Sequence, residues 1–307
     1  MRNILFVGLS SFTGFYFVKH LSKNKKNKIY CVLTKSKKKY DHLKKKRINI
    51  ASKIKNVHLL YNIKFGDKKF IKLVEKIKFE IFCFHHAHTD NYNDNFKFNL
   101  KKSVKENLNN VDNIFNKISN KSKIIITNTV FQKIERKKYK PLNNYGISKT
   151  VSYEKIKQLC RQYDIKYKSI FIPNPWGILE EKKLNFYLIN NWLNNNQTIV
   201  KYPNYIRDNI HIDKLSKEYN KVVNSKSKKI EYFPSQYCSS NKVFIEALRK
   251  KFEKFFKIKT SVIYSKNTKY DQPIERINGS KVLNKLNFNE NLNKYFKYYF
   301  KIVKKFN

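Results

Sequence analysis

The sequence predicts an α/β fold in which parallel strands form a doubly wound sheet, followed by a smaller C-terminal part. Over the first 172 residues, short apolar runs alternate with segments of helical period, which is typical of a parallel sheet covered by helices. After about residue 173 the elements become shorter and richer in aromatic residues and loops. We therefore expect a first domain at 1–172 and a second part at 173–307, from which residues about 205–220 return to the first domain.

The expected elements follow one another in regular order. Ile4 to Val7 is an apolar run suited to a buried parallel strand, and a helix is expected from about Phe12 to Leu21. Further strands are expected at Ile29–Leu33, His58–Tyr61, Ile81–Phe84, Ile124–Ile126 and Tyr167–Ile172. Further helices are expected around Phe70–Ile77, from about Phe96 to Ile118 and from about Tyr145 to Tyr163.

The charge of the chain is strongly positive. Lys+Arg 67 against Asp+Glu 22 gives a formal net charge of +45. The lysines are spread from Lys19 to Lys305, and arginine, which bidentate nucleic-acid contacts favour, is scarce. A general lysine bias on a solvated surface explains this better than a nucleic-acid site, and it would help to steer an anionic substrate. RNA binding through the basic surface stays the alternative.

The cysteines are far apart and form no C-x-x-C pair, so neither a zinc site nor a disulfide framework is predicted. A reducing cytoplasm is the expected compartment. Arg2 followed by an apolar stretch resembles a signal peptide, but Ser10, Ser11 and Thr13 interrupt that stretch. We therefore expect neither a metal nor a membrane partner.

Glycine is rare, with Gly 6 in 307 residues, so each glycine marks a place where a side chain is difficult to accommodate. Gly8 ends the first strand and Gly14 lies inside the first helix, as the first and third glycines of a G-x-x-G-x-x-G turn with Ser11 in the middle. Such a turn aims a helix N-terminus at a pyrophosphate. A dinucleotide-binding turn is thus predicted, with contacts from Gly8, Ser10, Ser11, Phe12 and Gly14.

Further motifs occur in a characteristic order. Gly66-Asp67 follows the third strand, His85-His86-Ala87 ends the fourth, Asn107 opens an Asn-rich helical segment, and Arg207-Asp208 begins R-D-N-I-H-I-D. This order resembles the extended short-chain dehydrogenase/reductases, the NAD-dependent epimerase/dehydratase family that includes UDP-galactose 4-epimerase. The resemblance implies an NAD(P)-binding Rossmann domain at 1–172 and a mainly substrate-binding part at 173–307. It also implies cofactor contacts from Asp67, His86, Ala87, Asn107 and Pro173.

The reactive pair of that family is Y-x-x-x-K, and Tyr145 and Lys149 fit it. In so lysine-rich a chain the pattern is weak, and it also occurs at Tyr40 and Tyr153, which we expect to be ordinary surface residues. Only Tyr145 opens a helix that follows a strand ending in a hydroxyl residue, Thr127. The segment T-N-T-V-F from Thr127 resembles the family's S-A-T-V-Y, which places Thr127 in the catalytic Ser/Thr position.

The chemistry fits this spacing, because residues i and i+4 share one face of a helix. Tyrosine has an unperturbed pKa of about 10, and a nearby ammonium together with an oxidised nicotinamide would favour the phenolate. In the mechanism that the resemblance implies, Tyr145 removes a proton from a sugar hydroxyl while hydride passes to the nicotinamide. Thr127 would bond the same oxygen, and Lys149 would also hold the ribose.

The residues that follow Thr127 reduce the number of reactions that the family resemblance allows. Dehydratases of the family carry Thr-Asp-Glu, but here Asn128 and Thr129 follow Thr127, so elimination of water is disfavoured. Epimerisation at C4 of a nucleotide sugar and reduction of a 4-ketone, for surface-polysaccharide sugars, both stay open.

Cofactor preference and substrate contacts depend on weaker signals. The second strand ends at Thr34 and Lys35 without a carboxylate, which favours NADP over NAD while leaving both open. The resemblance implies substrate contacts from Asn174, Arg207 and Asp271. It also implies a homodimer formed through a bundle of the 96–118 and 145–163 helices.

Overall fold

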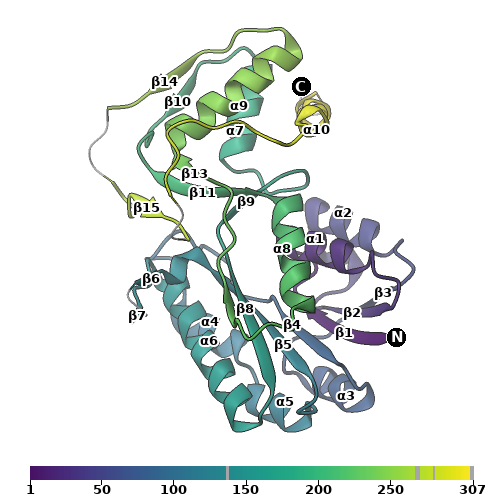
Figure 1. The fold of residues 1–307 in the computed structure, drawn as a ribbon. Helices are drawn as coiled ribbons and strands as arrows, with labels where there is room; N and C mark the ends of the chain where they lie inside the picture. The colour runs from purple at the N-terminus through teal and green to yellow at the C-terminus, as the bar shows by residue number, and fades with distance from the viewer. Residues whose placement is uncertain (136–137, 267–269, 279–280, 305–307) are drawn as a thin grey trace. The chain divides into compact units, whose positions relative to one another are not determined.

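The computed structural model describes residues 1–135, 138–266, 270–278 and 281–304. The chain forms two compact units (Figure 1). The first comprises Met1–Ile172 with Ile212–Pro234, and the second comprises Pro173–His211 with Ser235–Asn307. Each unit is described by itself below.

The first unit is built on a seven-stranded sheet in the order β12-β8-β5-β4-β1-β2-β3. Every neighbouring pair in this sheet is parallel. The strands are β1 (Arg2–Val7), β2 (Asn27–Leu33), β3 (Val57–Tyr61), β4 (Ile81–Phe84), β5 (Lys123–Thr129), β8 (Lys166–Ile172) and β12 (Glu231–Tyr232). The chain builds outward from β1 in both directions, so the predicted doubly wound parallel sheet is confirmed.

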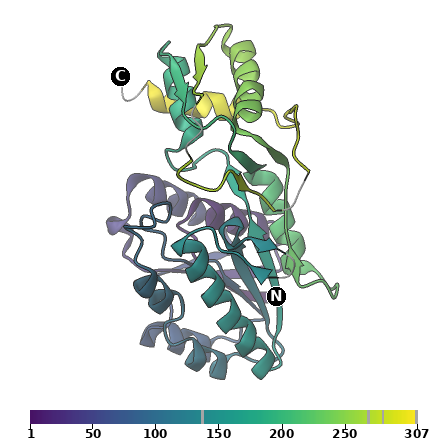
Figure 2. The ribbon, with the colours of Figure 1, turned by 90° about the vertical axis from the view of Figure 1, so that its left-hand side faces the viewer.

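Helices cover both faces of this sheet (Figures 1 and 2). On one face lie α1 (Phe12–Leu21), α2 (His42–Ala51) and α8 (Ile212–Asn224). On the other lie α3 (Lys68–Lys76), α4 (Leu100–Asn107), α5 (Val111–Lys117) and α6 (Asn144–Gln162). The core on this second face joins strand residues such as Leu5 and Phe82 to Phe70, Phe115 and Leu159 of the helices. A short hairpin, β6 (Ile134–Glu135) with β7 (Lys138–Tyr139), precedes α6.

The long helix expected from Phe96 to Ile118 is wrong, because α4 and α5 are separate helices. Asn110 adopts a left-handed conformation, with φ of 48°, which no α-helix continues through. The break is held in place by side chains: Asn109 donates to the Phe65 carbonyl at 3.0 Å and Asn110 to the Gly66 carbonyl at 2.7 Å. Hydrophobic periodicity runs across this break and therefore concealed it.

Helix α2 was not anticipated from the sequence. Its lysine-rich residues carry little apolar periodicity, and only Arg47, Ile48 and Ala51 are buried. The signal for its start is Asp41, whose side chain accepts a hydrogen bond from the Lys44 N–H at 2.8 Å and so caps the helix.

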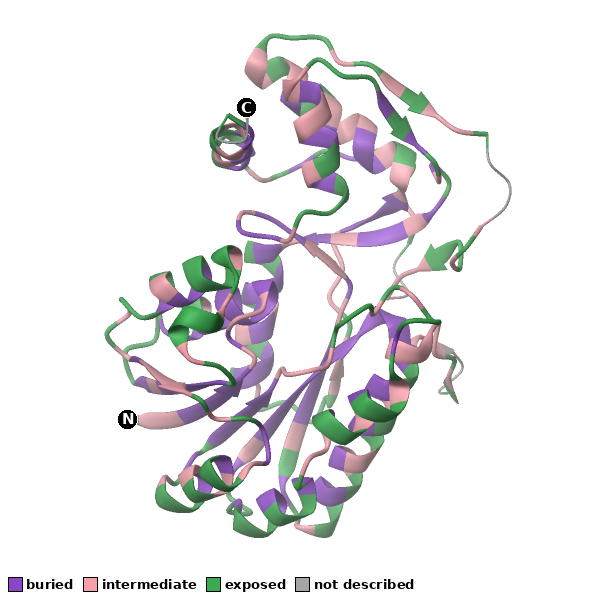
Figure 3. Cartoon of the chain, turned by 180° about the vertical axis from the view of Figure 1, so that it is seen from behind, coloured by how far each residue is buried: buried purple, intermediate pink, exposed green. Residues whose placement is uncertain are grey.

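The second unit contains smaller sheets. β11 (Ile206–His211) pairs with β9 (Asn174–Trp176), β13 (Tyr237–Ser240) and β15 (Glu275–Arg276), while β10 (Thr198–Val200) pairs with β14 (Val262–Tyr264). Its helices are α7 (Leu184–Leu193), α9 (Asn241–Phe256) and α10 (Asn293–Val303), and their buried faces form an aromatic-rich core (Figure 3). Buried Glu180 anchors α10, since Tyr295 and Tyr299 donate to its Oε1 at 2.7 and 2.8 Å.

Two further features bear on function. The four cysteines, Cys31, Cys83, Cys160 and Cys238, are buried free thiols. Within the described residues, no helix is long and apolar enough to cross a membrane, and no group of His, Cys, Asp and Glu side chains is arranged to hold a metal ion.

Candidate active site

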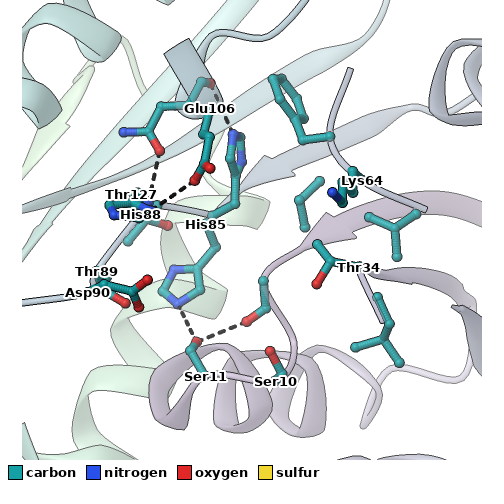
Figure 4. Close-up of a pocket in the computed structure, with 18 of the residues that line it drawn as sticks. Ser10, Ser11, Thr34, Lys64, His85, His88, Thr89, Asp90, Glu106 and Thr127 are labelled. Carbon is teal, nitrogen blue, oxygen red and sulfur yellow. Dashed lines mark hydrogen bonds and ion pairs between the residues drawn. The ribbon is translucent and has the colours of Figure 1, made fainter. Parts of the chain in front are cut away.

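A cavity of about 840 Å³ opens in the first unit at the carboxyl ends of β1, β2, β4, β5 and β8 (Figure 4). This edge is where ligands bind in doubly wound sheets, near the point where the strand order reverses. The cavity brings together most of the residues predicted for cofactor and catalysis. They are Gly8, Ser10, Ser11, Thr34, Lys35, His86, Ala87, Asn107, Thr127, Tyr145 and Lys149.

The turn between β1 and α1 forms one wall of this cavity. Gly8 has φ of 110°, which L side chains rarely adopt, and a Cβ on Gly14 would lie 2.2 Å from the Gly8 carbonyl oxygen. Both positions therefore require glycine. Ser11 caps α1: its Oγ accepts from the Gly14 N–H at 3.1 Å and donates to the Gly8 carbonyl at 2.9 Å. Its hydroxyl thus shapes the turn.

His85, which follows β4, ties that strand to the start of α1. Its Nε2 lies 2.9 Å from Thr13 Oγ1 and 3.2 Å from Ser11 Oγ. Figure 4 shows the imidazole reaching across the cavity floor to Ser11. The cavity-lining end of β4 and the cap of α1 are therefore fixed relative to each other.

Asn107, the last residue of α4, connects three parts of the site. Its backbone carbonyl lies 3.1 Å from His86 Nε2, and its Oδ1 accepts from the His88 N–H at 3.0 Å. Ser103, one turn earlier, bonds Ser148 of α6 through their hydroxyls at 2.7 Å. These bonds hold α4, the end of β4 and α6 together.

Tyr145 and Lys149 both project from α6 into the cavity, where Thr127 on β5 lies as well. Tyr145 is enclosed by three rings, with centroids 5.4 Å away for Tyr92, 5.7 Å for Phe131 and 6.0 Å for Phe98. The three predicted catalytic side chains thus line one cavity with the glycine turn.

Burial controls the electrostatics of this site. Loss of water raises the pKa of Tyr145 above its ordinary value, with a smaller contribution from Tyr92. The same effect lowers the pKa of Lys149 to about 8. Burial and the Lys149 charge lower the pKa of His85 to about 3 and contribute to lowering that of His86 to about 4. Both histidines are therefore neutral at pH 7.

Three residues of the first unit that were predicted to contact the cofactor lie outside the cavity lining. Phe12 and Gly14 are buried in α1, where they serve the packing of the turn. Asp67 caps α3 by accepting from the Phe70 N–H at 2.7 Å, and it also accepts from the Lys64 N–H at 3.0 Å. A structural role accounts for all three positions.

Pro173 and the predicted substrate residues belong to the second unit. There, Asn174 Oδ1 accepts from Arg276 at 3.0 Å, and Asp271 accepts from the Tyr205 hydroxyl at 2.5 Å. Arg207 donates to the carbonyls of residues 206, 273 and 274. Arg207 and Arg276 are register partners on the neighbouring strands β11 and β15. Burial and the charge of Arg276 lower the pKa of Arg207 to about 9.

The sequence reasoning missed several residues. His85 and Tyr40 line the cavity, and Arg276 neighbours Arg207. His85 could have been predicted as a cavity residue from its position, because it directly follows a buried parallel strand. Tyr153 was expected at the surface, but it is buried and donates to Glu231 at 2.8 Å, because it faces the sheet from α6.

Comparison with known proteins now decides the family. Residues 4–230, more than half of the chain, match the sequence model of the NAD dependent epimerase/dehydratase family. The chain belongs to this family. The resemblance stated from the motifs is therefore confirmed, and the enzymatic interpretation is favoured over RNA binding.

Solved structures of similar fold include 4-epimerases. UDP-glucuronic acid 4-epimerase from Bacillus cereus, determined with UDP-glucuronic acid and NAD, has a TM-score of 0.74 at 14% identity, covering 100% of both chains. The UDP-Glc/GlcNAc 4-epimerase of Campylobacter jejuni has a TM-score of 0.72 at 18% identity, covering 99% of this chain and 100% of its own. At these identities the likeness shows a shared fold. No curated protein matches the chain by sequence.

Burial of the Lys149 ammonium lowers the stability of the folded protein at neutral pH. Burial lowers the pKa of Lys149 to about 8 in the folded protein from 10.5 for an unperturbed lysine. The folded protein therefore binds fewer protons than the unfolded chain between about pH 8 and 10.5, and its stability rises with pH through that window. Replacing Lys149 by Met removes this penalty. In the cofactor-free protein we expect Lys149→Met to raise the free energy of unfolding at pH 7 by on the order of 2 kcal/mol. Urea denaturation at pH 7.0 and 9.5 measures this, and the advantage should shrink at pH 9.5. Equal stability of both proteins at pH 7.0 would contradict the prediction.

Proposed function

We propose that this protein is an NAD(P)-dependent enzyme that acts at C4 of a nucleotide sugar, using Tyr145, Lys149 and Thr127. One observation carries the proposal: these three side chains line the same cavity as the Gly8–Gly14 turn. Hydride transfer to or from a sugar carbon requires a proton-transfer group beside the dinucleotide, and Tyr145 lies at the same edge of the sheet as the turn that fits a dinucleotide.

The residues of the cavity fit a dinucleotide. The close approach of Gly8 and Gly14 brings the N-terminus of α1 to the cavity wall at Ser10 and Ser11, and the dipole and first-turn N–H groups of a helix favour a pyrophosphate at such a place. Thr34 and Lys35 lie where the adenosine ribose is held in such turns, and His86, Ala87 and Asn107 line the cavity beyond it. The dinucleotide, when bound, supplies the hydride acceptor and, in its oxidised form, a positive charge.

Tyr145 is the group that moves the proton. Its raised pKa keeps the phenol protonated in the free protein, so base catalysis needs added positive charge nearby. Lys149, with a pKa of about 8, is mostly protonated at pH 7 and contributes part of that charge. Once Tyr145 has lost its proton to solvent, its phenolate would accept the proton of the sugar hydroxyl while the hydride leaves to the bound dinucleotide, and Thr127 would donate to the same oxygen. In the reverse direction the Tyr145 phenol would protonate the ketone oxygen as hydride returns.

The surroundings of Thr127 argue against dehydration. Asn128 is buried and its Nδ2 donates to Ser169 Oγ at 2.7 Å, so an amide stands where elimination needs an acid. Epimerisation is supported by the names of the structural neighbours, which are 4-epimerases. Reduction of a 4-ketone uses the same residues and is the second candidate.

The second unit supplies the substrate contacts in this proposal. Arg207 and Arg276 form a cationic pair suited to a diphosphate, and Asn174 is bonded to Arg276. Asp271 is exposed and offers a carboxylate to ribose hydroxyls. The positive charge of the whole chain would speed the encounter with an anionic nucleotide sugar.

NADP is the proposed cofactor form. Asp41 is the carboxylate nearest in sequence to the end of β2, and it already caps α2 and pairs with Lys44 Nζ at 3.0 Å. Asp41 lines the cavity together with Lys35, Lys39, Lys44 and Lys64, so lysines outnumber the one carboxylate at this end of the cavity. This arrangement suits the additional phosphate of NADP better than the ribose hydroxyls of NAD.

We also propose a cytoplasmic location. The four buried free thiols support a reducing compartment, where disulfides seldom form.

A homodimer through α4 and α6 is a further part of the proposal. Apolar side chains are exposed on and beside these helices: Ile147 is 37% exposed, Val151 43% and Phe96 fully exposed. Burial of this surface against a second copy would remove it from water. Light scattering should therefore give twice the mass of one chain, and Val151→Glu should give a monomer. A monomeric wild-type protein would refute the dimer.

The catalytic role of Tyr145 is tested by turnover. The enzyme is incubated with a panel of UDP- and dTDP-sugars, and formation of the 4-epimer is measured. With the 4-keto derivatives of these sugars, consumption of NADH or NADPH is measured. Tyr145→Phe should lower kcat by roughly 10²–10⁴-fold, because it removes the proton-transfer group while keeping the ring. Tyr153→Phe is the matched control, since Tyr153 also precedes a lysine by four residues but bonds Glu231. Equal turnover by wild type and Tyr145→Phe would sink the mechanism.

Cofactor preference is tested by titration with NADPH and NADH, followed by fluorescence. NADPH should bind more tightly, and Lys35→Ala should weaken NADPH about 10-fold with little effect on NADH, as expected for loss of one charged hydrogen bond. Lys37→Ala, at an exposed lysine outside the cavity lining, serves as control. Tighter binding of NADH by the wild type would overturn the NADP assignment.

A further inference from the structure

Between the end of β4 and the start of α4, residues Thr89–Phe98 form a segment without regular structure, here called the strap. Its first two residues, Thr89 and Asp90, line the cavity, whereas the residues from 91 to 98 do not. The strap carries Tyr92 and Phe98, two of the rings that enclose Tyr145. It is therefore a candidate for positioning the catalytic phenol.

Hydrogen bonds join the strap to the first turn of α6. Asn143 Nδ2 donates to the Tyr92 carbonyl at 3.0 Å. The Asn144 N–H donates to Asn95 Oδ1 at 2.9 Å, and Asn144 Nδ2 donates to the Asn95 carbonyl at 3.0 Å. All of these bonds lie within two residues of Tyr145 in the chain.

Asn143 performs two functions at once. Its Oδ1 accepts from the Gly146 N–H at 2.8 Å and caps α6, while its Nδ2 holds the strap. The start of the catalytic helix and the strap are thus fixed by one side chain. A displacement of the strap would release Tyr92 from the Tyr145 ring without unfolding α6.

We propose that the strap positions Tyr145 for proton transfer, with Asn95 and Asn143 as positioning residues that hold the strap against α6. The inference rests on the proposed function, because it assigns these residues to the same reaction. Neither side chain lines the cavity, so both act through Tyr145 rather than on the substrate or cofactor.

Two substitutions loosen the strap and leave the helix intact. Asn143→Asp keeps the oxygen that caps α6 and loses the amide that donates to Tyr92. Asn95→Ala removes the acceptor of the Asn144 N–H from an exposed side chain, so misfolding is not expected. Each should lower kcat about 10-fold, since small displacements of a reacting group are costly, while the KM and the Kd of the cofactor stay within twofold. Asn95→Asp keeps the acceptor oxygen and should retain wild-type kcat.

A second readout does not depend on turnover. Hydrogen–deuterium exchange of peptides covering residues 88–99 and 143–150 should be faster in Asn143→Asp and Asn95→Ala, and unchanged in Asn95→Asp. Asn93→Ala is the matched control, because Asn93 is an exposed asparagine of the same strap. It should leave both kcat and exchange unchanged.

The outcomes separate the two proposals. If the wild type turns over no substrate of the panel, the proposed function fails, and exchange alone then decides whether the strap is coupled to α6. If the wild type is active but Asn143→Asp and Asn95→Ala retain full kcat, the positioning role is overturned. It is equally overturned if Asn95→Asp loses as much activity as Asn95→Ala.

Discussion

The site depends on the close approach between α1 and the end of β1. A Cβ on Gly14 would stand 2.2 Å from the Gly8 carbonyl oxygen, so the helix reaches its position only with glycine there. That position places Ser11 to cap the helix and to meet His85, and His85 in turn fixes the end of β4. From β4 the constraint continues through His86 to Asn107, and from α4 to α6 through Ser103 and Ser148. The wall that carries Tyr145 is thus positioned by a chain of short contacts that begins at one glycine.

Much of the first unit was predictable because buried parallel strands are continuous apolar runs. Ile4–Val7 and Ile81–Phe84 show this directly, and Thr127 follows such a run, although β5 continues two residues further, to Thr129. Hydrophobic periodicity did not predict the helices correctly where side-chain hydrogen bonds determine the backbone conformation or where the helix is highly charged. Asn110 ends a helix that the apolar pattern would continue, and lysine-rich α2 has almost no apolar pattern. The ties of His85 to α1, and of Asn95 to α6, join residues far apart in the chain, which a single sequence does not reveal.

In the free protein, burial of Tyr145 and Lys149 opposes the role proposed for them. Enclosure raises the pKa of Tyr145 and lowers that of Lys149, so both shifts disfavour the phenolate–ammonium state that the proposed proton transfer uses. A low-dielectric pocket of this kind also strengthens the effect of any charge that enters it. In the proposed mechanism, a cationic nicotinamide would therefore favour the Tyr145 phenolate, which burial disfavours in the free protein. Two neutral histidines beside Lys149 add no opposing positive charge.

In this chain, asparagine occupies many of the left-handed backbone positions that usually favour glycine. With Gly 6 in the sequence, left-handed turns are made by Asn62, Asn91, Asn110 and Asn195, all with φ between 48° and 56°. Asparagine tolerates this conformation because its short amide bonds locally to the backbone. The same amides cap helices at Asn99 and Asn143 and fasten the strap at Asn95. An asparagine bias that looks uninformative in the composition thus shapes the loops around the cavity. It also explains why Gly8 and Gly14 indicated the dinucleotide-binding turn so clearly. At both positions any Cβ, including that of asparagine, would approach backbone atoms too closely.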